Sequence, residues 1–127
     1  MGQPKENQEL LIAIARAVHE AERAYSLSIG ETQPPWEELP SETKATVREG
    51  VRAVLNMEVC CPSECHARWA KRMIVDGWDY GPEKNPAEKT HPGIVPWREL
   101  PVEQAEKDVL FFRIVSQFDR YWRESLK

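Results

Sequence analysis

The sequence predicts an all-α protein, with four helices in two unequal helix–loop–helix repeats. Apolar residues recur at steps of three and four along most of the chain, and no segment shows convincing alternation of apolar and polar residues. A six-residue motif also occurs twice, each time before a predicted helix. At 127 residues the chain is expected to form a single domain, 1–127.

The first two helices follow from spacing and from helix-ending residues. A helix is predicted over about 6–29, because one of its faces collects Leu11, Ile14, Val18, Ala21 and Tyr25. Gly30 is expected to end it. The second helix follows Pro40, and Ser41 is its expected N-cap. Gly50 inside this helix indicates the close approach of another helix, since glycine otherwise costs about 1 kcal/mol there.

The other two helices flank a long proline-rich loop. The third helix follows Pro62-Ser63 and ends at Asp76-Gly77. The fourth is predicted over about 102–124, with one face formed by Phe111, Ile114, Val115, Phe118 and Trp122. The loop between them, 77–97, is expected to be structured, because aromatic side chains in a free linker would gain nothing by staying in water. Its only extended-looking run, Ile94-Val95, is too short to found a sheet.

Self-comparison indicates an internal duplication, with one repeat over about 6–57 and another over about 62–125. His19 and Gly30 are separated by the same distance as His66 and Gly77. The segments 35–40 and 96–101 share the pattern Pro-Trp-x-Glu-Leu-Pro. The second repeat therefore carries an insertion, which holds three of the loop's rings: Trp78, Tyr80 and His91.

Composition excludes several classes of partner. The formal net charge is −4, so no basic field favours a nucleic acid polymer. No apolar run is long enough for a membrane span, and the first residues lack the apolar core of a signal peptide. The three clustered cysteines do not form a disulfide framework. A cytoplasmic location is the simplest expectation.

Signatures of catalysis and metal binding are missing. The sequence has no glycine-rich phosphate loop, no Gly-x-Ser-x-Gly and no His-Glu-x-x-His, so neither an enzyme nor a cofactor is expected. Cys60, Cys61, Cys65 and His66 are metal ligands by type, but they lack the paired Cys-x-x-Cys spacing of zinc sites, which favours ordinary packing. His19 and His66 are interpreted as buried histidines bonded to a helix end or to a carbonyl.

The loop rings allow two interpretations. They form either a stacking platform for a flat ligand or a plug that closes the loop onto the helices. Trp78 is assigned to stacking, because the first repeat has Glu31 at that position and needs no ring there. Trp97 is interpreted as scaffold, because it has a counterpart in Trp36.

The second half resembles the ryanodine receptor repeat domain. The resemblance is carried by residues in four stretches, which are His66 with 69–72, then 77–82, then 89–92, and last 95–97 with Leu100, Pro101 and Asp108. The first half resembles a degenerate copy. The resemblance implies an all-helical module of the small stand-alone type found in bacteria and their phages, and it implies that Trp78 stacks on an adenine nucleotide. Tyr80, Lys71, His91 and Trp97 are implied only as neighbours.

We therefore expect non-enzymatic binding of a nucleotide or nucleotide-derived signal, adenine- or ADP-ribose-like, as a sensor or a sponge. Trp78 would stack, Tyr80 and His91 would bond to ribose or base, and phosphate would meet one of three cations: Lys71, Arg72 or Lys89. Because Glu31 replaces a second ring, a homodimer would supply the other wall of the site. The alternative is a protein-interaction or structural module whose aromatic loop packs internally. An enzyme acting on nucleotides is the weakest hypothesis.

Overall fold

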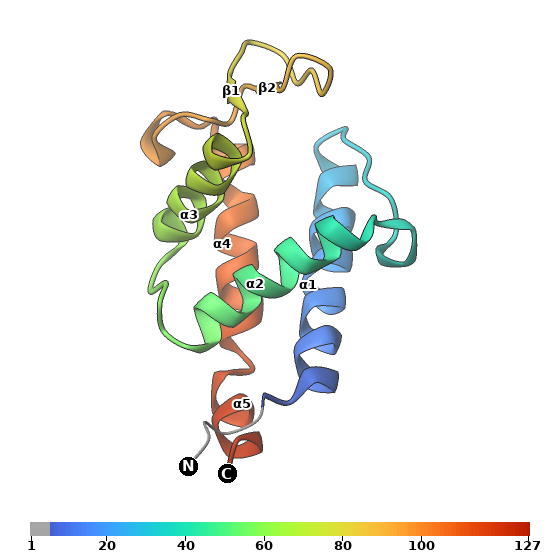
Figure 1. Ribbon diagram of the computed structural model, residues 1–127, viewed down its shortest axis with the longest axis vertical. Coiled ribbons are helices and arrows are strands. Elements are labelled where there is room, and N and C mark those ends of the chain that lie inside the picture. The colour runs from blue at the N-terminus through green and yellow to red at the C-terminus, as the bar shows by residue number, and fades with distance from the viewer. Residues whose placement is uncertain (1–5) are drawn as a thin grey trace.

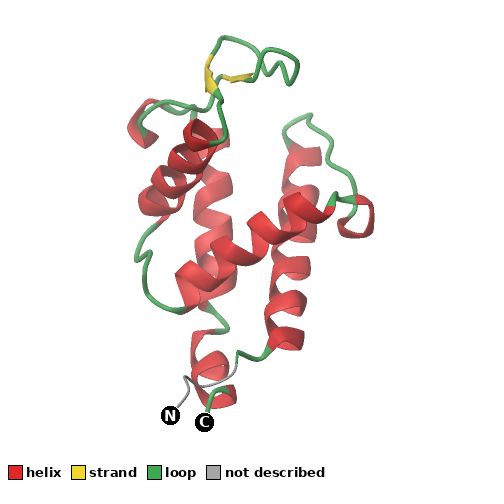
Figure 2. Cartoon of the chain, in the orientation of Figure 1, coloured by secondary structure: helices red, strands yellow, loops and turns green. Residues whose placement is uncertain are grey.

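The computed structural model describes residues 6–127 and is predominantly helical. Its α-helices are α1 (Gln8–Ser28), α2 (Ser41–Leu55), α3 (Pro62–Val75), α4 (Val102–Ser116) and α5 (Asp119–Ser125). Two short 3-10 turns, η1 (Trp36–Glu38) and η2 (Trp97–Glu99), precede α2 and α4. Figures 1 and 2 show α2 running diagonally across α1 and α4, with α3 beside α4.

The core forms where α1 meets α2 and α4. Leu11, Ile14 and Val18 of the predicted apolar face of α1 are buried there, whereas Ala21 and Tyr25 are only partly buried. The members of this core that are almost fully buried are Leu11, Ile14, Ala15, Val18, Val51, Ala53, Leu55, Val115 and Trp122. Gly50 meets α4 closely, because a Cβ added to it would lie 3.2 Å from Cζ of Phe111. The close helix approach expected at this glycine is thus confirmed.

The start of α2 differs from the prediction by one residue. Pro40 occupies the N-cap position with an extended ψ of 152°, and its carbonyl accepts a hydrogen bond from the Lys44 N–H at 3.0 Å. Ser41 is the first helical residue, and no side chain caps this end. Proline fixes φ at a value that suits the entry to a helix, so the expected serine cap was wrong.

The expected fourth helix is in fact two helices. The chain leaves α4 at Ser116 and re-enters a helix at Asp119, through Phe118 with φ −98° and ψ 0°. The turn directs Trp122 into the core, where it is 1% exposed and its indole N–H donates to Oδ1 of Asn56 at 3.3 Å. No glycine or proline marks this break, so burial of the indole is the physical reason for it.

The loop contains a small parallel sheet that periodicity did not predict. Strand β1 (Asp79–Tyr80) pairs with β2 (Thr90–His91), in the register Asp79 to Thr90 and Tyr80 to His91. The Asp79 N–H donates to the Lys89 carbonyl at 2.9 Å, and the Gly81 N–H donates to the His91 carbonyl at 3.3 Å. Two residues per strand are too few for alternation to be visible in the sequence. Figure 2 shows this sheet at the end of the molecule above α3.

Gly81 is expected to be essential for the pairing of β1 with β2. A Cβ added to this buried glycine would lie 2.5 Å from the Cβ of Thr90, so Gly81→Ala must push the strands apart. In Gly81→Ala we expect the amide hydrogens of residue 81 and Asp79 to exchange at least about ten times faster than in the wild type, with little change in global stability. Gly30→Ala is the control, because an added Cβ there meets nothing within 4 Å and only backbone strain at φ +81° remains. Unchanged exchange in Gly81→Ala would contradict the steric argument.

Candidate ligand-binding site

Four rings form a row from the loop to the helices. The Trp78 and His91 ring centroids lie 6.4 Å apart, those of His91 and Trp69 lie 4.9 Å apart, and those of Trp69 and His66 lie 5.5 Å apart. The first two contacts are edge-to-face, a favourable geometry for aromatic pairs. Trp69 was missed as a site residue. Its position one helical turn after His66 was the available signal.

His91 lies at the centre of this row as a neutral imidazole. Its Nδ1 accepts a hydrogen bond from the Gly93 N–H at 2.9 Å, which places the proton of the neutral ring on Nε2. Burial lowers the pKa of His91, and the nearby Lys84 and Lys107 ammonium groups lower it further. A neutral His91 can offer an Nε2–H donor at neutral pH.

Trp78 and Tyr80 remain accessible on the loop. Gly77, with φ +94°, turns the chain out of α3, and the Trp78 N–H donates to the Met73 carbonyl at 2.9 Å. The Trp78 side chain is half-buried, whereas Tyr80 is 53% exposed. The ring expected to stack is therefore held against His91 without being enclosed.

Two of the three predicted phosphate-binding cations have internal partners. Arg72 pairs with Glu49 at 3.0 Å and with Asp76 at 3.2 Å. Lys89 donates to the Asp76 carbonyl at 2.9 Å, at the C-terminus of α3, where a cation is favourable. Lys71 is exposed and has no ion pair among residues 6–127. Arg72 and Lys89 thus meet at Asp76, two residues before Trp78, but both are engaged by the protein itself.

Another lysine, Lys84, acts on the ring of His91, and sequence reasoning did not single it out. Burial lowers the pKa of His91, and the charge of Lys84 lowers it further. The pKa of Glu31 is lowered mainly by its hydrogen bond from Lys107, with a smaller contribution from Lys84. Glu31 accepts hydrogen bonds from Gln104 Nε2 and Lys107 Nζ, each at 2.6 Å. Glu31, which stands where a second stacking ring would be, thus links the end of α1 to α4 through these two bonds.

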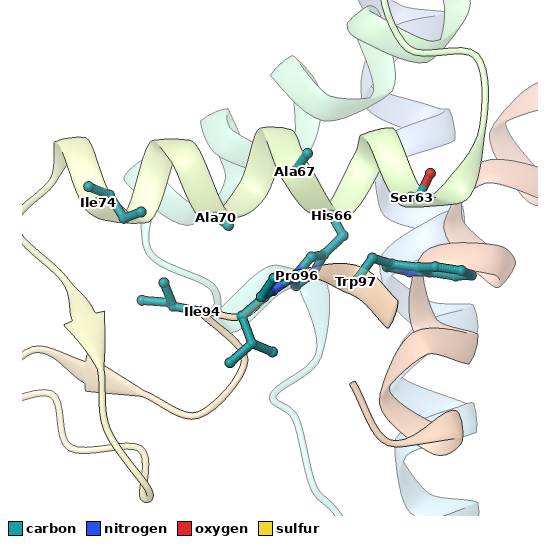
Figure 3. A pocket seen from close by; sticks show the side chains of 9 residues that line it. Ser63, His66, Ala67, Ala70, Ile74, Ile94, Pro96 and Trp97 are labelled. Carbon is teal, nitrogen blue, oxygen red and sulfur yellow. The ribbon is translucent and has the colours of Figure 1, made fainter. Parts of the chain in front are cut away.

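Trp97 takes the position before α4 that its counterpart Trp36 takes before α2, while its assignment to the scaffold stays a prediction. It begins η2 and lines a groove of about 320 Å³ between α3 and the segment 94–97 (Figure 3). No other predicted site residue lines this groove, whose walls are Ser63, His66, Ala67, Ala70, Ile74, Ile94, Val95, Pro96 and Trp97. The buried indole N–H of Trp97 reaches hydrogen-bonding geometry with no described residue.

Both repeat histidines bond to a carbonyl, which confirms their structural interpretation. His19 Nε2 lies 2.8 Å from the Pro34 carbonyl oxygen, and His66 Nε2 lies 2.8 Å from that of Val95. Each ring is at least 94% buried. In both halves the accepting residue stands two positions before the motif tryptophan.

Three ionisable side chains, Glu22, Cys65 and Asp108, form a cluster where α1, α3 and α4 adjoin, which the sequence did not indicate. Burial raises the pKa of Glu22 to about 8, and the neighbouring Asp108 raises it further. Burial also raises the pKa of Asp108 to about 6, although the neighbouring His66 counteracts it. The pKa of the Cys65 thiol is raised by burial to about 12, so it stays protonated. No group of three metal-ligating side chains occurs among residues 6–127.

The fold and site thus define a predominantly helical domain with an aromatic loop at the end of α3. A protein-family model, the RyR domain, matches residues 52–114. This stretch runs from the last turn of α2 into α4 and includes the loop with its rings. No curated protein matches the chain. Within the described residues, no helix is long and apolar enough to span a bilayer.

Proposed function

We propose that the protein binds a nucleotide or nucleotide-derived signal, adenine- or ADP-ribose-like, without turning it over, as a sensor or a sponge. The observation that carries this proposal is the accessible Trp78, which the sheet holds against His91 within the stretch that matches the RyR domain. An indole face of this kind stacks on a flat base with about 1–3 kcal/mol. The neutral His91 and the exposed Tyr80 would bond to ribose or base.

The phosphate end of the ligand is the part of the proposal that the structure changes. Arg72 and Lys89 already have partners, so Lys84, whose charge acts on His91, would meet a phosphate without breaking either of these internal bonds. As Glu31 holds Gln104 and Lys107 where a second ring would stand, the other wall of the site would come from a second copy of the chain.

The small stand-alone bacterial or phage type, the duplication and a cytoplasmic location belong to the same proposal. The duplication is supported by the matching histidine bonds and by the left-handed glycines Gly30 and Gly77, which end α1 and α3 in the same way. In both halves the next N–H bonds back to the helix, from Glu31 to Ser26 at 2.8 Å and from Trp78 to Met73 at 2.9 Å.

The alternative is a protein-interaction or structural module. The contact of Trp78 with His91 favours it, because that contact closes the loop onto Trp69 and α3 without any ligand. In that case removal of the Trp78 ring would cost stability and not only binding.

Trp78→Ala is expected to weaken binding of adenine nucleotides at least about tenfold, because the stacking face is lost. The measurement is calorimetry with AMP, ADP, ATP, ADP-ribose and cyclic signals, with thermal melting of the same samples. Tyr121→Ala is the matched control, since Tyr121 is an exposed ring on α5. The proposal fails if no compound binds the wild type below about 1 mM, or if Trp78→Ala binds normally. A lowered melting temperature in Trp78→Ala alone would support the alternative.

A further inference from the structure

In the two halves of the chain, different side chains contact the loop segment that follows the first helix of that half. This difference leaves a groove beside α3 in the second half. In each half, the helix histidine binds the carbonyl two residues before the motif tryptophan. Each motif tryptophan also begins a three-residue 3-10 turn, η1 in one half and η2 in the other. The segments 33–36 and 94–97 therefore occupy corresponding places beside α1 and α3.

In the first half, two charged side chains of α1 fill this place. Glu20 Oε2 accepts a hydrogen bond from the Trp36 N–H at 2.8 Å. Arg23 Nε donates to the Gln33 carbonyl at 3.2 Å, and Arg23 also pairs with Glu20 at 2.9 Å. The backbone groups of the loop segment are thereby satisfied by the protein itself.

In the second half, the corresponding residues of α3 are Ala67 and Ala70, which follow His66 at the same spacing as Glu20 and Arg23 follow His19. Alanine reaches neither backbone group. Within residues 6–127, the Trp97 N–H and the Ile94 carbonyl, which correspond to the two bonded groups of the first half, have no hydrogen-bond partner. Both alanines line the groove of about 320 Å³, and Figure 3 shows it between α3 and the segment that carries Ile94 and Trp97.

The walls of the groove define what would fill it. An occupant must offer an acceptor to the Trp97 N–H and a donor to the Ile94 carbonyl, as Glu20 and Arg23 do in the first half. Apart from Ser63 and His66, the other walls are apolar: Ala67, Ala70, Ile74, Val95 and Pro96. A charged group would lose its hydration there without a counter-ion, so a neutral polar edge is favoured. The volume lies at the lower end of the range for small-molecule sites.

We propose that this groove is a second ligand site, for a small neutral heterocycle with an acceptor beside a donor, as on the amidine edge of adenine. The base would lie between α3 and the segment 94–97, with its ring nitrogen facing the Trp97 N–H and its amino group facing the Ile94 carbonyl. The site does not include Trp78, and it goes beyond the proposed function of the aromatic loop.

The test fills the groove with the charged pair of side chains that the first half of the chain uses. The double variant Ala67→Glu/Ala70→Arg places in α3 the pair that closes the first half, so it is expected to fold and to melt no lower than the wild type. Adenosine is titrated into both proteins, and backbone amide NMR shifts are followed at Ala67, Ala70 and Trp97. We expect shifts in the wild type and none at these amides in the double variant. Purine riboside, which lacks the amino group, should bind roughly fivefold more weakly.

Several outcomes would overturn the proposal. They are shifts that persist in the double variant, equal affinity for purine riboside and adenosine, and no shift at these amides with about 10 mM adenosine. Amide shifts that depend on the protein concentration and not on the adenosine concentration would show that a second copy of the chain occupies the groove, which also overturns the proposal. If the double variant does not fold, Ala70→Leu fills the groove without charge and must abolish the same shifts. Trp78→Ala should retain them, so failure of the loop site and failure of the groove are distinguishable.

Discussion

Replacing Trp122 by alanine is expected to lower the free energy of unfolding by about 3–5 kcal/mol, because it leaves a large cavity. The side chain is 1% exposed, and its indole N–H bonds to Asn56 at the end of α2. The loss would also leave the side-chain oxygen Oδ1 of Asn56 without this donor. Denaturation by urea, followed by far-UV circular dichroism, measures the change.

The neighbouring Tyr121 provides the matched control. It lies on the same short helix, but it is 66% exposed, so Tyr121→Ala should change stability by less than about 0.5 kcal/mol. Equal losses in the two variants would show that α5 matters only for its helical backbone. A small loss in Trp122→Ala would show that the turn at Phe118 is not maintained by burial of the indole.

Glu22→Gln is expected to stabilise the protein above neutral pH. The pKa of Glu22 in the folded protein is about 8, against an ordinary value of 4.5. Between these two values the folded chain holds the proton more tightly than the unfolded chain, so stability decreases as pH rises from about 4.5 to about 8. Glutamine has nearly the same shape and cannot lose a proton, which removes this dependence.

The groups that face Glu22 set the size of the effect. They are Asp108 and Lys107 from α4, and Cys65 from α3. At pH 7.5 the shift corresponds to at most about 4 kcal/mol, and about 2 kcal/mol is expected for a half-buried carboxyl group. The free energy of unfolding of the wild type and of Glu22→Gln is measured by urea denaturation from pH 4.5 to 8.5. The two plots of this free energy against pH should coincide at the acidic end and separate at the alkaline end. Parallel plots over the whole range would contradict the raised pKa.

Asp108→Asn separates the two carboxyl groups. The pKa of Asp108 is raised only to about 6, so its own contribution to the pH dependence should end near that pH. If the gain in the free energy of unfolding of Asp108→Asn over the wild type kept growing above pH 7, the pH dependence of stability in the alkaline range would belong to Asp108 and not to Glu22.

The helices could be predicted wherever a local pattern determines them. The apolar spacing of α1 and the ends of α3 at Pro62 and Gly77 were read correctly within about two residues. The division between α4 and α5 could not be predicted, since it depends on the burial of Trp122 against α2 and leaves no glycine or proline in the sequence. The parallel strands depend on contacts between residues that lie a loop apart.

The structure brings the predicted rings Trp78 and His91 into contact and leaves Tyr80 exposed, while their role in binding a ligand stays a prediction. These residues could be singled out because a structured loop needs a reason to carry aromatic side chains. The internal partners of Arg72 and Lys89 depend on where α2 and the end of α3 lie in space, which residue type cannot show. The groove could not be predicted from the sequence either. Ala67 and Ala70 indicate a site only once the structure shows that their counterparts, Glu20 and Arg23, bond to the loop backbone of the first half.

The packing of α1 against both α2 and α4 has a consequence for synthesis on the ribosome. The apolar stripe of α1 is covered from two sides, and one of them, α4, begins only at Val102. A nascent chain must therefore carry this stripe partly uncovered until most of the sequence has emerged, so chaperone contact with α1 should persist until α4 is released. Stalled or truncated products that end before α4 are expected to aggregate through α1.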